Sequence, residues 1–277
     1  MPRHVVKLLR NLQRPAVFGM IHVPALPGTP SSSMTVPQIL QVVEKEANIY
    51  YENGVDGIIL ENMHDIPYVQ SDKIGPEIVS TMALACSTVE SIIRPKRLVM
   101  ALGVQILAGG NREAMAVAHS TGCDFIRAEG YVFSHVADEG WMDACAGSLL
   151  RYRRMIGADD VAVFTDVKKK HSSHSVTSDI SLVETVKAAE FFMTDGVILT
   201  GNSTGEKADP KEMHAVLDST SLPVLIGSGV DVWNVKEFKQ AAAVIVGSSL
   251  KKNGHWKGEL CSDRVKRMVH ATKRLLL

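Results

Sequence analysis

Short apolar segments alternate with longer amphipathic segments along the chain. The short segments are rich in Val, Ile and Leu, which is typical of strands buried on both faces of a parallel sheet. Their spacing averages roughly 32 residues, a plausible length for one repeated βα unit. Eight segments are expected to be strands: 16–23, 57–62, 98–105, 125–131, 161–168, 196–201, 223–229 and 243–248.

The longer segments repeat apolar residues every three or four positions, as amphipathic helices do. Within 36–53, for example, the apolar residues spaced by three or four are Ile39, Val42, Val43, Ala47 and Tyr50. Seven segments are expected to be helices: 36–53, 75–93, 111–121, 181–193, 210–217, 231–240 and 262–275.

This alternation predicts a parallel sheet covered by helices. Eight βα units within 277 residues favour a single closed (β/α)8 barrel, a TIM barrel, over an open doubly wound sheet. A dinucleotide-binding fold is disfavoured, because the first strand runs into the sequence HVPALPG at 22–28 and not into a G-x-G-x-x-G turn. Residues 15–277 are therefore expected to form one barrel domain.

The segment 1–14 is basic, amphipathic and free of acidic residues. Two interpretations are open. It could be a short helix that closes the bottom of the barrel, or an organellar transit peptide, which is also Arg-rich and acid-poor. The first interpretation leaves the protein in the cytoplasm, and the second takes it to the mitochondrion.

Composition excludes several classes of protein. The chain has 30 Lys and Arg and 30 Asp and Glu residues, so it lacks the excess of cations that a general nucleic-acid binder needs. No apolar run reaches the ~18 residues of a membrane-spanning helix. The four cysteines form no CxxC pair and no zinc-binding spacing, and they are expected to be free thiols.

Glycine and serine follow the last two expected strands. Small residues there leave backbone N–H groups open to an anion, and a helix N-terminus behind them would add its dipole. TIM barrels commonly bind phosphate at these two loops, although tight βα turns would also use glycine. The candidate phosphate-binding residues are Gly227, Ser228, Gly229, Gly247, Ser248 and Ser249.

Charged residues at the end of the fifth strand are the best candidates for chemistry. Asp166 could transfer a proton, and Lys168, beside a carboxylate, could act as a base or a Schiff-base nucleophile. Lys169 is expected to point outward, because strand side chains alternate between faces. On the fourth strand, Arg127 could hold an anionic substrate and Glu129 could be a base. The alternative is a layer of buried ion pairs in the barrel mouth.

Other polar residues at strand ends complete the candidate site. His22 and Glu61 join Asp166, Lys168 and Glu129 as candidate catalytic residues. No cofactor is expected, although His22, Glu61 and Asp166 could together hold a divalent metal. The loops 132–147 and 171–179 are polar and could form a lid. The remaining candidate substrate-binding residues are Asn62, Gln105, Lys170, His171, Thr200 and Asn202.

Several segments of this chain resemble the BtpA family, from about residue 15 to residue 270. The similar segments include GMIHVPALPG at 19–28, GVDGIILEN at 54–62, FIRAE at 125–129, DVKKKH at 166–171 and TGNSTG at 200–205. The resemblance implies a TIM barrel of the ribulose-phosphate-binding type. Lys168 and Gln105 depart from the family pattern, which commonly has His and Asn at these positions.

The resemblance implies two different functions. Sugar-operon members of the family look like sugar-phosphate enzymes, some of them similar to phosphoribosylanthranilate isomerase, which pairs an acid and a base on strands one and five. Here those positions would be His22 and Asp166, and the cysteine that this isomerase uses on strand one is absent. Another member is implicated in assembling photosystem I.

Two hypotheses follow. The first is an enzyme with isomerase- or lyase-type chemistry on a phosphorylated sugar or nucleoside-derived molecule. The second is a non-catalytic assembly or stability factor for a membrane protein complex. Burying charge costs desolvation energy that an assembly factor has no need to spend, which favours the enzyme. A homo-oligomer is expected, because barrels of this kind commonly form homo-oligomers.

Overall fold

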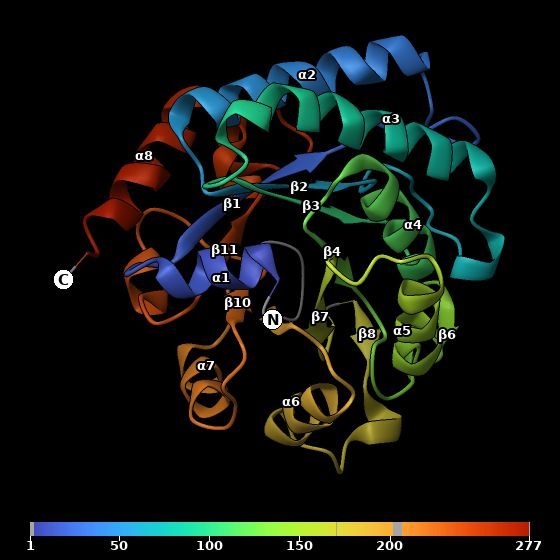
Figure 1. The fold of residues 1–277 in the computed structure, drawn as a ribbon, viewed down its shortest axis with the longest axis vertical. Helices are drawn as coiled ribbons and strands as arrows, with labels where there is room; N and C mark the ends of the chain where they lie inside the picture. The colour runs from blue at the N-terminus through green and yellow to red at the C-terminus, as the bar shows by residue number, and fades with distance from the viewer. Residues whose placement is uncertain (1–2, 170, 202–206, 277) are drawn as a thin grey trace.

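The computed structural model describes residues 3–169, 171–201 and 207–276. Within these residues, eight parallel strands close into a barrel in the order β1-β11-β10-β9-β7-β4-β3-β2 (Figure 1). Each lies within one of the expected segments, so the predicted TIM barrel is confirmed. The strands are β1 (Ala16–His22), β2 (Gly57–Glu61), β3 (Ala101–Gln105), β4 (Phe125–Ala128), β7 (Ala162–Val167), β9 (Gly196–Leu199), β10 (Val224–Ile226) and β11 (Ala243–Val246).

Helices cover the outside of the barrel. The apolar face of α2, including Ile39, Val43 and Ala47, packs into the cluster between helices and strands. A capping box of Thr35 and Gln38 begins this helix, and Gly54, with a left-handed φ of 68°, ends it. The outer helices are α2 (Val36–Asn53), α3 (Pro76–Ile93), α4 (Asn111–Thr121), α5 (Ala146–Met155), α6 (Leu182–Phe191), α7 (Pro210–Leu217) and α8 (Ser262–Lys273).

The structure corrects one helix prediction and adds one helix that was not predicted. The helix expected at 231–240 is wrong: only a 3-10 helix, η4 (Val235–Phe238), forms there. Asp231 and Asn234 hold a turn, because the Asp231 carboxylate accepts the N–H groups of Trp233 and Asn234. The helix α5 was not predicted, since the polar sequence before it reads as one long loop. The other 3-10 helices are η1 (Ser71–Lys73), η2 (Arg94–Lys96), η3 (Ser175–Thr177), η5 (Ser248–Leu250) and η6 (Lys252–Gly254).

A second apolar cluster fills the barrel itself. The ring of Phe125 lies 5.5 Å from that of Phe18 and 5.1 Å from that of Phe164, between ring centroids. Gly103 makes room for this stack, because a Cβ there would lie 2.3 Å from the Phe125 ring. The barrel is therefore a packed core and not a pore.

The N-terminal segment forms α1 (His4–Asn11), which lies across one end of the barrel (Figure 1). Its buried residues Val5, Val6 and Leu9 join the cluster inside the barrel. Arg3 also donates to the backbone carbonyl of Asp159 at 2.8 Å. The segment thus contributes to the core, while the domain boundary between residues 14 and 15 stays a prediction.

The two long polar loops meet in a small antiparallel sheet. It contains β6 (Gly140–Met142), β5 (His135–Ala137) and β8 (Ser172–Ser173), in that order. The first two come from the loop after β4, and the third from the loop after β7. Across the described ranges, no helix combines the length and the apolar character needed to cross a membrane.

Candidate functional site

The barrel strands place one ring of candidate residues above the apolar interior. On β1, Phe18 and Met20 belong to the cluster inside the barrel, so the two-residue period of a strand also turns His22 inward. The same alternation applies to the other seven strands. It yields a ring formed by His22, Glu61, Gln105, Arg127, Asp166, Thr200, Gly227 and Gly247. The structure therefore brings together candidates from all eight strands.

Arg127 and Asp166 pair within this ring. The Arg127 Nε and Nη2 atoms donate to the two Asp166 oxygens at 3.0 and 2.9 Å. Burial opposes the charged guanidinium, but Asp166, Glu61 and Glu129 raise the pKa of Arg127 above its ordinary value. The guanidinium therefore remains charged, and the two hydrogen bonds fix the orientation of both side chains.

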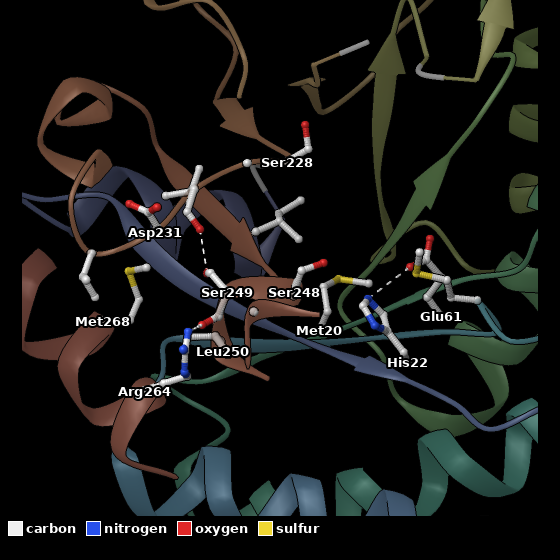
Figure 2. A pocket seen from close by; sticks show the side chains of 18 of the residues that line it. Met20, His22, Glu61, Ser228, Asp231, Ser248, Ser249, Leu250, Arg264 and Met268 are labelled. Atoms are coloured by element: carbon white, nitrogen blue, oxygen red, sulfur yellow. Dashed lines mark hydrogen bonds and ion pairs between the residues drawn. The ribbon is translucent and has the colours of Figure 1, made fainter. Parts of the chain in front are cut away.

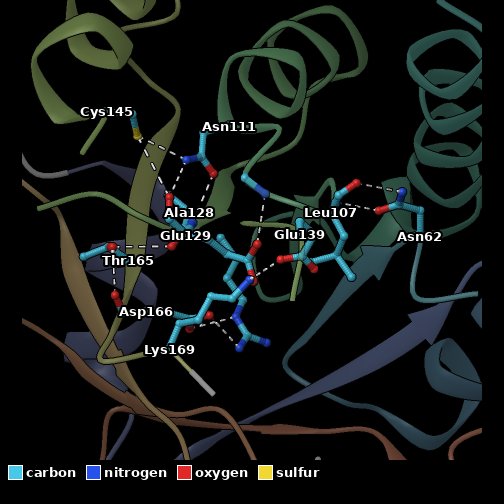
Figure 3. Close-up of polar contacts among 12 residues, drawn as sticks. Asn62, Leu107, Asn111, Ala128, Glu129, Glu139, Cys145, Thr165, Asp166 and Lys169 are labelled. Carbon is cyan, nitrogen blue, oxygen red and sulfur yellow. Dashed lines mark hydrogen bonds and ion pairs between the residues drawn. The ribbon is translucent and has the colours of Figure 1, made fainter. Parts of the chain in front are cut away.

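Lys169 reaches the buried carboxylates of Glu129 and Glu139 (Figure 3). The Lys169 Nζ lies 3.2 Å from Glu129 Oε1 and 3.8 Å from Glu139 Oε2, and its side chain is buried. The expectation that Lys169 points outward is therefore wrong. Lys168 has a positive φ of 50°, which breaks the strand alternation. Its Nζ donates instead to the Ile180 carbonyl at 2.7 Å.

The Glu129 carboxylate is held in its charged form. Burial opposes ionisation, but Lys169, the Gly109 N–H at 2.9 Å and Arg127 together lower its pKa. For Lys169, burial is outweighed by Glu129 and Glu139, which raise its pKa. Glu129 is therefore held in an ion pair with Lys169 and is not a free base.

A cavity of about 460 Å³ opens beside this network (Figure 2). His22, Glu61 and Arg127 line it at the barrel mouth, and His22 Nε2 lies 3.8 Å from Glu61 Oε2. The His22 Nδ1 atom lies 3.4 Å from the Trp256 carbonyl. An imidazole held between a carbonyl and a carboxylate is suited to moving a proton. We call this space the phosphate cavity, because the residues predicted to bind phosphate line it.

All six candidate phosphate-binding residues line the phosphate cavity. No hydrogen bond found within the described residues has the N–H of Gly229, Ser248 or Ser249 as its donor. Arg264, on α8, donates to the Ser249 carbonyl at 3.0 Å and also lines the cavity. An α-helix was expected to begin behind each of these loops and to add its dipole to the anion site. This expectation is wrong, because only the short 3-10 helices η4 and η5 follow the loops.

Gly247 and Gly227 leave space that a side chain would fill. A Cβ at Gly247 would lie 3.0 Å from two ring atoms of His22, and one at Gly227 would lie 3.5 Å from Arg127 Nη2. The two glycines therefore allow the loops to approach the charged floor of the cavity.

The remaining candidates differ in position. Gln105 is buried, and its Oε1 has no hydrogen-bond partner in the described structure; the same holds for Thr200 Oγ1. Asn62 binds the loop after β3, since it accepts the Leu107 N–H at 2.7 Å. His171 is exposed. Lys170 and Asn202 lie outside the described residues.

Three residues that contact the candidate site or line its cavity were not predicted from the sequence. Glu139 reaches Lys169 from the turn between β5 and β6, Asn111 donates to the Glu129 carbonyl at 2.6 Å, and Arg264 lines the cavity. None of them lies at the end of a barrel strand, where the candidate residues were expected. As for metal, no group of three or more His, Cys, Asp and Glu side chains in the described ranges is arranged to hold an ion.

Solved structures share this fold at low sequence identity. The 3-hexulose-6-phosphate synthase of Salmonella typhimurium matches with a TM-score of 0.56 and 14% identity, over 94% of this chain and 99% of that one. The phosphoribosyl anthranilate isomerase of Thermotoga maritima matches with a TM-score of 0.56 and 12% identity, over the same shares. These matches show that the two enzymes have the same barrel fold as this chain.

Sequence relatives cover almost the whole chain. A Caenorhabditis elegans protein described as uncharacterized and mitochondrial is 55% identical over 96% of each chain. The photosystem I biogenesis protein BtpA of Synechocystis is 32% identical over 92% of this chain and 87% of that one. The pattern of the BtpA family matches residues 13–274. This chain belongs to the BtpA family.

Proposed function

We propose that this chain is an enzyme acting on a phosphorylated sugar or nucleoside-derived small molecule, with isomerase- or lyase-type acid/base chemistry. One observation carries the proposal: a single cavity is lined both by the two Gly–Ser loops and by His22, Glu61 and Arg127. Anion-binding backbone groups and proton-transfer side chains thus face the same space. The known sugar-phosphate enzymes that share the fold support the phosphate part.

The roles follow from what each group faces. The phosphate binds the N–H groups of Gly229, Ser248 and Ser249. His22 transfers the proton with Glu61 as its partner, because both line the cavity. Arg127, oriented by Asp166, stabilises negative charge that develops on the substrate.

Other candidates take supporting roles in this proposal. Gln105 and Thr200, whose buried oxygens have no partner in the described structure, bind sugar hydroxyls. Glu129 keeps Lys169 in place on the side of the network away from the cavity. Lys168 takes no part in proton transfer, because its ammonium is bound by the Ile180 carbonyl.

Location and assembly are part of the same proposal. The described location of the Caenorhabditis elegans relative supports the mitochondrion for this chain. A homo-oligomer remains an expectation from other barrels, to be measured by light scattering.

Thermal unfolding tests the phosphate site. We would compare inorganic phosphate, ribose 5-phosphate and nucleoside monophosphates, because a ligand at 100 times its Kd stabilises by about 2.7 kcal/mol. Ser228→Asp should abolish the stabilisation, since it places a carboxylate in the phosphate loop. Ser148→Asp is the control, because Ser148 is exposed on α5. No stabilisation of the unaltered protein by any phosphate would refute the proposal.

A second candidate is a non-catalytic assembly factor, as the name of the Synechocystis relative suggests for that protein. The observation in its favour is an apolar surface at the end of α6, where Phe191 is 82% and Met193 69% exposed. Exposed groups of this kind mark contact surfaces. If this candidate is correct, Phe191→Ser with Met193→Ser should abolish capture of a membrane complex and leave phosphate binding unchanged.

A further inference from the structure

A second cavity, of about 610 Å³, lies beside the phosphate cavity. We call it the side cavity. It is bounded by the loop after β1, by α2 and by the segment 251–260 that follows β11. Its apolar lining consists of Pro24, Met34, Val42, Ile49, Ile66 and Leu260, together with the Trp256 side chain.

His22 connects the two spaces, because it lines both of them. Its Nδ1 atom is held at 3.4 Å by the carbonyl of Trp256, whose side chain is part of the side cavity. The proposed proton-transfer group can therefore be approached from two sides. A substrate with its reacting bond at His22 would have one half in each cavity.

The two cavities differ in chemistry. The phosphate cavity has Gly–Ser loops and three Arg side chains, Arg127, Arg264 and Arg267. The side cavity has an apolar wall and aromatic rings, with the His64 ring centroid 4.9 Å from that of Trp256. Rings of this kind favour a flat aromatic ligand. Met34 at the rim is 41% exposed and can adapt to the shape of a ring.

Among the polar and charged residues of the side cavity, Glu46 favours a ligand that donates a hydrogen bond. Glu46 Oε1 is bound by the Lys251 ammonium. Glu46 Oε2 is buried and has no hydrogen-bond partner in the described structure. The Leu260 backbone also lies near this carboxyl and opposes the rise in its pKa that burial causes. Burial, with Lys251 and Lys257 nearby, lowers the pKa of His64 to about 4, so this imidazole is neutral.

We infer that the side cavity binds a neutral aromatic ring carrying an N–H group, as the non-phosphorylated half of a substrate whose phosphate lies in the phosphate cavity. The ring packs between Trp256 and the apolar wall, and its N–H donates to Glu46 Oε2 after a small movement of that side chain. This inference rests on the proposed function, because it assigns the second half of the same substrate.

Two separate probes distinguish this inference from the proposed function. Indole, a neutral ring with an N–H group, probes the side cavity, and ribose 5-phosphate probes the phosphate cavity. Binding of each is measured by calorimetry on the full chain. Val42→Trp fills the side cavity from α2 and should weaken indole binding by about tenfold or more without changing ribose 5-phosphate binding. The matched control is Gln41→Trp, since Gln41 is exposed on the same helix.

A second variant covers the case in which Val42→Trp fails to fold. Met34→Ala removes a half-exposed wall of the side cavity and should also weaken indole binding. Indole binding that is absent, or equal in all these proteins, would overturn the inference. If ribose 5-phosphate also fails to bind, the proposed function fails too. If it binds and indole does not, only the assignment of the side cavity fails.

Discussion

Arg127 and Asp166 form a two-point ion pair at the barrel mouth, with 4% and 3% of their side chains exposed. Asp166 belongs to β7 and Arg127 to the neighbouring β4, so the pair joins two strands. The same guanidinium lines the phosphate cavity. Stability and substrate binding should therefore respond differently when the pair is altered.

Removing one partner should destabilise the fold. Asp166→Ala leaves a buried guanidinium without its carboxylate, and the free energy of unfolding should fall by about 3–5 kcal/mol. The double variant Arg127→Met with Asp166→Leu should regain most of this loss, because no charge is left unpaired. It should still lose ribose 5-phosphate binding. Urea unfolding and calorimetry measure the two effects, and a double variant as unstable as Asp166→Ala would contradict this account.

The two adjacent lysines should differ sharply. Lys169→Met leaves the Glu129 and Glu139 carboxylates buried without their cation, so stability should fall by about 3 kcal/mol or more. Lys168→Met removes one hydrogen bond to a backbone carbonyl from a half-buried side chain, which should cost about 1 kcal/mol. Urea unfolding of both variants provides the comparison. Equal losses of unfolding free energy in the two variants would show that Lys169 does not stabilise the two buried carboxylates.

Acid should destabilise the protein through two histidines. Burial is the main cause that lowers the pKa of His64 and of His135 from 6.5 to about 4. Between these values the unfolded imidazoles take up protons and the folded ones do not, so the free energy of unfolding falls as the pH falls. Urea midpoints at pH 7.5 and 5 should show this decrease. In the double variant His64→Phe with His135→Phe, the urea midpoint should fall less between pH 7.5 and pH 5. A fall as large as in the unaltered protein would argue against buried neutral histidines.

The N-terminal helix should contribute to global stability. Leu9 is 4% exposed and packs inside the barrel end with Val5 and Val6. Leu9→Ala should lower the free energy of unfolding by about 2–5 kcal/mol, as is usual for a buried leucine. Lys7→Ala, on the exposed face of α1, is the control and should change little. A Leu9→Ala protein as stable as the control would show that α1 does not close the barrel.

The sequence by itself determined the barrel and most of its ring of polar residues. Strand positions follow from apolar runs, and a strand presents alternate residues to one face, so His22 could be placed beside the apolar Met20 and Phe18. Gly227 and Gly247 could also be predicted from the sequence, because they directly follow the apolar residues of the last two strands. Where the backbone of a strand stays regular, its two-residue period is sufficient to predict which side chains face the barrel interior.

Only the tertiary structure decided which lysine enters the site and how the polar loops close. The positive φ of Lys168 breaks the alternation just beyond β7, which turns Lys169 inward toward Glu129. Glu139 contacts that lysine from the turn between β5 and β6, two strands of the small sheet that the two loops form. Likewise, the 3-10 helix η4 replaced an expected α-helix because Asp231 and Asn234 bind their own backbone. Such contacts depend on backbone turns and on residues distant in sequence, and neither leaves a periodic signal.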